Sequence, residues 1–407
     1  MPYSSEKNGP VSCHRSLRFV RKKSTGGLSL GLRRGITGGR LAKGHHRVVA
    51  DLYRAGDKAD ILALNRMEYG PTDILATPAD FHWRYAQNPA GQAIISVVRD
   101  CDNGSAVGFI WIVPLHVRIK GQDRLAATGT NLIIHPEYRT FGYIKLMRRF
   151  QQVFRDHDIP LHFSFVSERT YRQQRERNPQ TVSTIPLLVK PLNFESLAQT
   201  YSTKRWQRFI IGWAGRLVSP FFFRPRSVAY SGEIIVQAVD QFDEGFDEFW
   251  RKVRDKYPVM VIRDRDFLSW RFAPVSGRQY HILVARSREQ MLGYTVLRCL
   301  TIRGVKTGLI MDLLVTDGVL GEVVGACLMA EAETYFRAQE MSLTVGLMVP
   351  LAAEYRVLRR AGYTRIPQAF APRTFRFAFF VHNTGDIDLV SLSAQDWFIT
   401  TADYESF

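Results

Sequence analysis

The stretch that decides the fold is ATGTNLIIHPEYRTFGYIKLMRRFQQV, residues 127–153. Within it, Asn131–Ile134 is a short apolar run bounded by polar residues, which predicts a buried strand ending before Pro136. A turn follows through residues 137–142. Apolar side chains then recur at helical spacing: Tyr143, Leu146, Met147, Phe150 and Phe154. A strand, a sharp turn and a helix are therefore expected.

The turn leads into the positive end of the expected helix. Unpaired backbone N–H groups point outward there, and such a place can hold a pyrophosphate. Gly142 would let the backbone approach a ligand closely, or adopt a left-handed turn, at little steric cost. The segment is therefore a candidate phosphate-binding turn.

The same stretch resembles motif A of the GNAT acyltransferases, the acetyl-CoA-dependent N-acetyltransferase superfamily. In that motif an apolar strand and a Pro precede Arg/Gln-x-x-Gly-x-Gly/Ala at the start of a long helix. Arg139 and Gly142 match, as do the run His135–Tyr138 and the pair Leu146–Met147. Ile144 stands where the motif has its last small residue.

The resemblance implies acetyl-CoA or another acyl-CoA as co-substrate, with no metal. Arg139 and Lys145 would add charge to the pyrophosphate seat, and the edge of the preceding strand could pair with pantetheine amides. A backbone N–H in the Ile133–Ile134 region would polarise the thioester. The predicted cofactor-binding residues are Leu132, Ile133, Ile134, Arg139, Thr140, Phe141, Gly142, Tyr143, Ile144 and Lys145.

Proton-handling residues are predicted on the helix over residues 168–177, which the resemblance places after the fifth strand. The position where the family usually has a Tyr falls near Gln174, and Tyr171, one turn earlier, is the nearest phenol. Tyr171 is therefore either a general acid or a packing residue. Glu168 or Asn131 would orient a water that acts as base. The predicted catalytic residues are Tyr171, Glu168 and Asn131.

The pattern begins again after residue 231, at an offset of 181 to 187 residues. Asp312–Val315 repeats Asn131–Ile134, and Leu343–Leu347 repeats Leu161–Phe165. Trp270-Arg271 repeats the pair at residues 83–84, for which a structural role is expected. Two copies of one α/β unit account for this order. The predicted fold is α/β (α+β), with two tandem GNAT-like domains, each a mixed, mostly antiparallel sheet flanked by helices.

The predicted domains are an acyl-CoA-binding unit over residues 47–195 and a second unit over residues 231–407. The second unit is expected to be degenerate, because Asp317 to Glu322 lacks a basic residue and carries two acids that would repel a pyrophosphate. Residues 196–230 are predicted as an amphipathic linker helix. Within it, residues 204–224 alternate aromatic and cationic side chains, so contact with a membrane surface is an alternative to docking on the domains.

Charge is unevenly distributed along the 407 residues. The formal net charge is +17, and residues 1–49 hold eleven Lys or Arg and one acid. Residues 1–46 are predicted to form a disordered basic arm. There are three alternatives for this segment. It could be an organelle transit peptide, it could contact nucleic acid, or the predicted start codon could lie too far upstream. Nucleic acid is not an expected partner of the remaining chain.

Composition also bounds the compartment. The four cysteines have no metal or redox spacing: Cys13, Cys101, Cys299 and Cys327. No run of about 18 apolar residues predicts a transmembrane helix. A cytoplasmic protein is therefore expected, at the inner face of the membrane if residues 204–224 bind there.

The expected function is acyl transfer from acyl-CoA to an amine. The long two-copy layout resembles acyltransferase-like proteins of cell-envelope or polysaccharide synthesis, so an amino sugar or other glycan is one candidate acceptor, and a small-molecule amine is another. A non-catalytic GNAT-like scaffold is one alternative, favoured by Ile144 and by the missing helix Tyr. A Fem-like transferase that uses charged tRNA is the other. That family generally lacks the intact motif, whereas Arg139 and Gly142 are present here.

Overall fold

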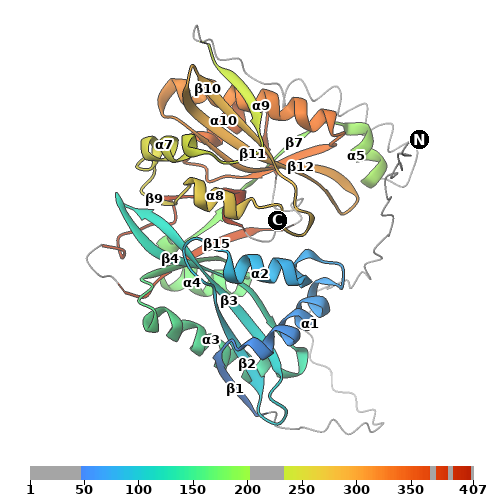
Figure 1. The fold of residues 1–407 in the computed structure, drawn as a ribbon, viewed down its shortest axis with the longest axis vertical. Coiled ribbons are helices and arrows are strands. Elements are labelled where there is room, and N and C mark those ends of the chain that lie inside the picture. The colour runs from blue at the N-terminus through green and yellow to red at the C-terminus, as the bar shows by residue number, and fades with distance from the viewer. Residues whose placement is uncertain (1–46, 202–232, 367–372, 384–387, 405–407) are drawn as a thin grey trace, which may run out of the picture. The chain divides into compact units, whose positions relative to one another are not determined.

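The computed structural model describes residues 47–201, 233–366, 373–383 and 388–404 (Figure 1). The predicted basic arm, residues 1–46, lies outside these ranges. Most of the predicted linker helix, including residues 204–224, also lies outside them, and only its start is described, within α5 (Phe194–Tyr201). The described chain forms two mixed sheets flanked by helices, which confirms the predicted fold class.

The first sheet has nine strands, and its main path runs β1-β2-β3-β4-β5-β15-β6. Neighbours on this path pair antiparallel, except that β4 and β5 are parallel. β9 pairs with β3 and β16 pairs with β9. The strands are β1 Val48–Leu52, β2 Ile94–Asp100, β3 Ala106–Ile119, β4 Gln122–Ile134, β5 Leu161–Phe165, β6 Val182–Ile185, β9 Val259–Val261, β15 Phe375–Val381 and β16 Trp397–Phe398.

The second sheet has seven strands in the order β14-β7-β13-β12-β11-β10-β8. β10, β11 and β12 pair antiparallel, and β12 pairs parallel with β13. The first sheet has the same succession in β2, β3, β4 and β5, so the internal repeat extends to strand pairing. The strands are β7 Leu187–Pro191, β8 Ile235–Val239, β10 His281–Ser287, β11 Gln290–Ile302, β12 Val305–Val315, β13 Leu343–Leu347 and β14 Thr364–Arg365.

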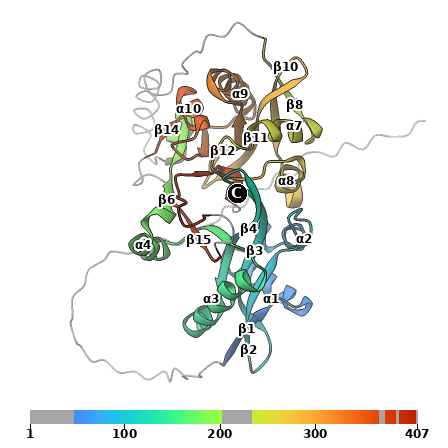
Figure 2. The ribbon, with the colours of Figure 1, turned by 90° about the vertical axis from the view of Figure 1, so that its left-hand side faces the viewer.

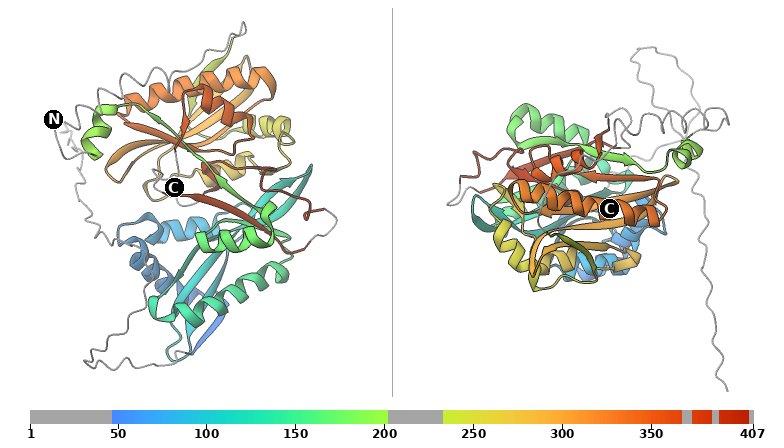
Figure 3. Two further views of the ribbon diagram at one scale, coloured as in Figure 1. Left: turned by 180° about the vertical axis from the view of Figure 1, so that it is seen from behind. Right: turned by 90° about the horizontal axis from the view of Figure 1, so that it is seen from above.

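The two sheets exchange strands. The sequence predicts one strand over residues 182–189, but the structure has two, because Pro186 has no N–H to continue a ladder. β6 pairs with β15 in the first sheet, whereas β7 pairs with β13 in the second. β15, from the end of the chain, lies between β5 and β6 (Figure 3). Residues 47–195 thus supply a strand to the second sheet, and residues 231–407 supply strands to the first.

Helices cover both faces of the first sheet (Figure 2). Successive strand residues point to opposite faces. Ile133 shares a buried cluster with Ile61 of α1, whereas Ile134 shares another with Leu146 of α3, so α1 and α3 lie on opposite faces. The remaining helix bounds are α1 Lys58–Tyr69, α2 Pro78–Ala86, α3 Arg139–Asp156, α4 Glu168–Arg177, α7 Glu244–Val253, α8 Arg265–Arg271, α9 Gly318–Ala338 and α10 Ala353–Arg360.

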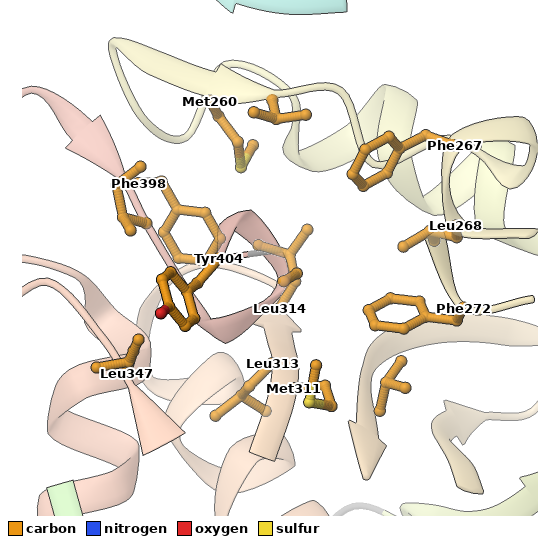
Figure 4. Packing of buried hydrophobic residues seen from close by; sticks show 14 of the residues in the cluster. Met260, Phe267, Leu268, Phe272, Met311, Leu313, Leu314, Leu347, Phe398 and Tyr404 are labelled. Carbon is orange, nitrogen blue, oxygen red and sulfur yellow. The ribbon is translucent and has the colours of Figure 1, made fainter. Parts of the chain in front are cut away.

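The last described segment, residues 397–404, packs against the second sheet. Phe398 and Tyr404 belong to the same buried cluster as Leu314 of β12 and Leu347 of β13 (Figure 4). The Thr401 hydroxyl oxygen accepts a hydrogen bond from the N–H of Leu347 at 3.0 Å. This segment is thereby held beside the ends of β12 and β13, and this places Tyr404 at the site described next.

Candidate functional site

β4 and β5 separate after a short parallel ladder. The ladder contains only the pairs of Ala127 and Thr128. β4 nevertheless continues to Ile134, so its edge from Gly129 onward has no strand partner on the β5 side within the described residues. The Ser164 hydroxyl donates to the Gly129 carbonyl oxygen at 2.9 Å, across the start of the gap. A free strand edge of this kind can pair with an extended ligand.

A β-bulge accompanies this separation. The register between β3 and β4 shifts between Phe109 and Trp111, and Asn131 opposite the shift has φ of 51°. Asn accepts this left-handed conformation more readily than most residues. Because a bulge bends its strand and increases the local twist, Asn131 helps to turn the end of β4 away from β5.

A cavity of about 470 Å³ occupies the gap, and residues from both faces of the sheet line it. Tyr143, Met147 and Phe150 share one side of α3 at spacings of four and three residues, and they line the cavity from that face. Tyr69, at the end of α1, lines it from the opposite face together with Tyr404. The cavity is therefore lined from both faces of the sheet.

The predicted cofactor-binding residues divide into three groups. Leu132 and Tyr143 line the cavity. Ile133, Ile134 and Gly142 are buried in the two cores. The others are exposed in the first two turns of α3: Arg139, Thr140, Phe141, Ile144 and Lys145. The exposed group forms the rim of the helix start, where a phosphate would lie, and the cavity begins beside it.

Local contacts fix the start of α3. The Tyr138 hydroxyl donates to Asp100 at 2.5 Å, and this hydrogen bond is the main cause that raises the pKa of Tyr138 to about 12. Arg139 Nε donates to the Ile134 carbonyl oxygen at 3.3 Å. Gly142 lies in the first turn of the helix, so the left-handed alternative is wrong. A Cβ there would make ordinary contacts, the nearest at 3.6 Å to Ile134 and Tyr138.

Of the three predicted catalytic residues, Asn131 lines the cavity, and the other two do not belong to its lining. Glu168 forms an ion pair with Arg376 of β15. The Tyr171 hydroxyl accepts a hydrogen bond from Thr184 at 3.4 Å. Thr170 of their helix, α4, and Ser167 just before it belong to the lining.

Sequence reasoning missed several lining residues. His162 of β5 contacts His382 through their ring nitrogens at 2.6 Å, and burial lowers the pKa of His162 well below its ordinary value. Arg373, Asp403 and Tyr404 come from the end of the chain. No local pattern predicts them, because only the exchange of strands brings this segment to the first sheet.

The charged lining consists of one guanidinium and one carboxylate among the described residues. The carboxylate, Asp403, accepts two hydrogen bonds from Arg263 Nη2, both at 2.8 Å. Arg263 also donates to Asp312 at 3.1 Å, and all three side chains are fully buried. Burial lowers the pKa of Arg263, but the two carboxylates outweigh it and leave that pKa raised. Asp403 is thus bound within the protein by a guanidinium that it shares with Asp312.

In the second sheet, side chains of the protein occupy the end of β12, the strand that corresponds to β4. Val315, at the end of β12, donates its N–H to Glu354 at 3.2 Å, and its carbonyl oxygen accepts from Lys256 at 2.7 Å. Lys256 and Glu354 form an ion pair of 2.8 Å, with Glu354 fully buried. Asp317 precedes α9, whereas Arg139 begins α3. The β13 side of β12 also has no strand partner after Ile310 in the described residues, but there the backbone N–H and carbonyl oxygen of Val315 are bound by Glu354 and Lys256.

Two general features are absent from the described ranges. None of the helices there is long and apolar enough to cross a membrane. Those ranges also hold no group of three or more His, Cys, Asp or Glu side chains placed to bind a metal ion.

Comparison with known proteins gives structural matches. Neither a sequence family nor a curated protein matches the chain. A probable N-acyltransferase of Enterococcus faecalis V583 matches with a TM-score of 0.54 and 11% identity, over 82% of this chain and 73% of that one.

Two further solved structures match over most of both chains. Saccharomyces cerevisiae N-myristoyltransferase with bound myristoyl-CoA gives a TM-score of 0.53 and 12% identity, over 81% of this chain and 82% of that one. A GCN5-related N-acetyltransferase of Anabaena variabilis gives a TM-score of 0.53 and 12% identity, over 83% of this chain and 74% of that one. Such low identities establish the fold alone. The described chain therefore has the GNAT fold that its motif predicts.

Proposed function

We propose that the first sheet and its helices bind an acyl-CoA and transfer the acyl group to an amine. The observation that carries this proposal is the gap between β4 and β5. A free strand edge, a cavity lined from both faces and the start of a helix meet there. These are the features that a thioester on an extended arm and a second substrate both require.

The donor enters from the α3 face. Its pyrophosphate lies against the first turn of α3, where backbone N–H groups and the helix dipole favour an anion. Arg139, exposed beside this turn, adds charge. The pantetheine arm pairs with the edge of β4 between Gly129 and Ile134. The acyl group then extends into the cavity beside Met147 and Phe150.

The acceptor amine enters from the opposite face and attacks the thioester carbon. The carbon–nitrogen bond forms, the carbon–sulfur bond breaks, and CoA leaves as a thiolate that takes up a proton. The ammonium must lose one proton before the attack, and the nitrogen loses a second proton as the amide forms, which balances the proton that the thiolate takes up. A backbone N–H near Ile133 stabilises the thioester oxygen. Asn131 orients the amine or a water that accepts its proton, because its side chain lines the cavity. Tyr171 and Glu168 remain predicted proton carriers.

The second sheet has a structural role in this proposal. Lys256 and Glu354 occupy the end of β12, so an acyl-CoA would have to displace a buried ion pair. Removing one partner of such a pair costs about 3–5 kcal/mol. The second unit holds the C-terminal segment in place, and that segment supplies Tyr404 to the cavity of the first.

A binding protein without catalysis is the second candidate. Ile144 is exposed at the helix start, where the motif has its last small residue, and Phe141 is exposed beside it. Large side chains there favour a surface that binds without positioning the thioester for attack.

The two candidates separate in one assay. Purified protein is mixed with acetyl-CoA, octanoyl-CoA or myristoyl-CoA and a panel of amines that includes amino acids and amino sugars, and free thiol is followed. Amine-dependent thiol release supports the transferase. Binding of an acyl-CoA with no release of free thiol in any of these mixtures supports the binding protein.

A further inference from the structure

The cavity contains one basic side chain that has no carboxylate partner among the described residues. Arg373 is exposed and lines the cavity. It donates to the Tyr404 hydroxyl, and its guanidinium lies over the Tyr404 ring at 5.1 Å from the centroid. Among the described residues no carboxylate lies within ion-pair distance of Arg373. By contrast Arg376, three residues on, is paired with Glu168.

The carboxylate in the lining is bound to another guanidinium. Asp403 accepts two hydrogen bonds of 2.8 Å from Arg263. It accepts a third, of 2.9 Å, from the backbone N–H of Thr400. His162 adds no positive charge, since burial lowers its pKa well below its ordinary value. Arg373 is therefore the only guanidinium in the described lining, and none of the described carboxylates pairs with it.

The position of Arg373 indicates that it binds the acceptor and not the acyl-CoA. Its neighbour Tyr404 packs edge-on against Phe165, at 5.0 Å between centroids. Phe165 lies on the same face of β5 as Phe163, which belongs to the cluster of α1, so this is the face opposite α3. A donor whose phosphates lie at the start of α3 has its phosphates on the other face. Arg373 is thus placed for the second substrate.

We propose that the acceptor is an amine that also bears a carboxylate, such as a free amino acid, and that Arg373 holds this carboxylate. This inference rests on the proposed acyl transfer. A planar guanidinium binds a carboxylate through two parallel hydrogen bonds. One guanidinium balances the single charge of a carboxylate, whereas a phosphate monoester carries nearly two charges. The product would be an N-acyl amino acid.

The test uses product analogues that differ only in charge. N-acetyl-, N-octanoyl- and N-myristoylglycine are compared with the corresponding glycinamides by calorimetry. The carboxylate member of at least one pair is expected to bind about tenfold more tightly than its amide, the usual scale of a charge-assisted hydrogen bond. Arg373→Gln is expected to remove this preference and Arg373→Lys to reduce it. Arg169→Gln, an exposed cation of α4 outside the lining, is expected to leave it unchanged.

Acyl-CoA binding is measured on the same proteins, and Arg373→Gln is expected to leave it unchanged. If acyl-CoA binds but no pair shows a preference for the carboxylate, or no analogue binds, the assignment of Arg373 is wrong while acyl transfer stands. A preference that survives Arg373→Gln also overturns it. Absence of all acyl-CoA binding would instead remove the proposed function.

Discussion

Trp83 and Trp270 each donate the indole N–H to the other's backbone carbonyl oxygen, at 2.7 and 3.2 Å. Their rings stack at 5.1 Å between centroids with 18° between the planes. The two residues occupy equivalent positions of the internal repeat, in α2 and α8. A reciprocal pair of this kind joins the two units about a local two-fold relationship, and it confirms the structural role predicted for the repeated Trp-Arg.

Trp83→Ala should therefore destabilise the protein strongly. Both rings are buried, and removal of a buried Trp side chain costs about 3–5 kcal/mol. Urea unfolding of Trp83→Ala, Trp270→Ala and the double variant measures the coupling between them. The double variant should lose less than the sum of the single losses. Strict additivity would show that the two rings do not act as a pair.

Arg263→Met should destabilise by leaving two buried carboxylates, Asp312 and Asp403, without their cation. The expected loss in the free energy of unfolding is about 3–5 kcal/mol. A triple variant that also carries Asp312→Leu and Asp403→Leu should recover part of this loss, because the uncompensated charges are gone. A triple variant less stable than Arg263→Met would contradict this account of the cluster.

The sequence predicts the strands and helices around the site better than it predicts which residues line the cavity. The strand that ends at Ile134 and the helix over residues 168–177 form as predicted, because their boundaries are set by local sequence. Pro186 was available as a signal that residues 182–189 do not form one strand. Nothing local indicates that β15 joins the first sheet, because strand exchange depends on tertiary pairing. Arg373 and Tyr404 were missed for the same reason, and Tyr171 was placed by resemblance alone.

Gly129→Ala should narrow the cavity. A Cβ at this position would lie 2.8 Å from Phe150 Cζ and 2.9 Å from Ser164 Oγ, so the Phe150 ring would have to move. Overpacking of this kind costs about 1–3 kcal/mol. Binding of octanoyl-CoA should weaken more than binding of CoA itself, as measured by calorimetry. Gly56→Ala, with no atom within 4 Å of its new Cβ, is the control. Equal weakening for both ligands would place the acyl chain elsewhere.

The His162–His382 pair should make the protein less stable in acid. Burial lowers the pKa of His162 well below its ordinary 6.5, and it lowers the pKa of His382 to about 4. In the unfolded chain both titrate near the ordinary value. As the pH falls below about 6.5, the unfolded state takes up protons that the folded state does not. The free energy of unfolding therefore falls, until His382 also protonates in the folded state near pH 4.

Urea unfolding at several pH values between 7 and 4 tests this expectation. Each histidine contributes up to about 1.4 kcal/mol per pH unit within its window. A variant with His162→Phe and His382→Phe keeps ring stacking with Phe154 and Phe380 but cannot titrate. Its stability should depend less on pH over this range. An unchanged slope would show that other groups cause the loss in acid.

Binding of acyl-CoA to variants at the start of α3 shows whether the first sheet and its helices hold the acyl-CoA there. Calorimetry compares the wild-type protein with Arg139→Glu/Thr140→Glu, in which both exposed positions at the first turn become acidic. Val319→Glu, at the exposed first turn of α9, is the matched control in the second unit. The account predicts micromolar binding of at least one acyl-CoA, a loss of at least about tenfold in the double variant, and no change in Val319→Glu. No binding by the wild-type protein, or an equal loss in Val319→Glu, would contradict it.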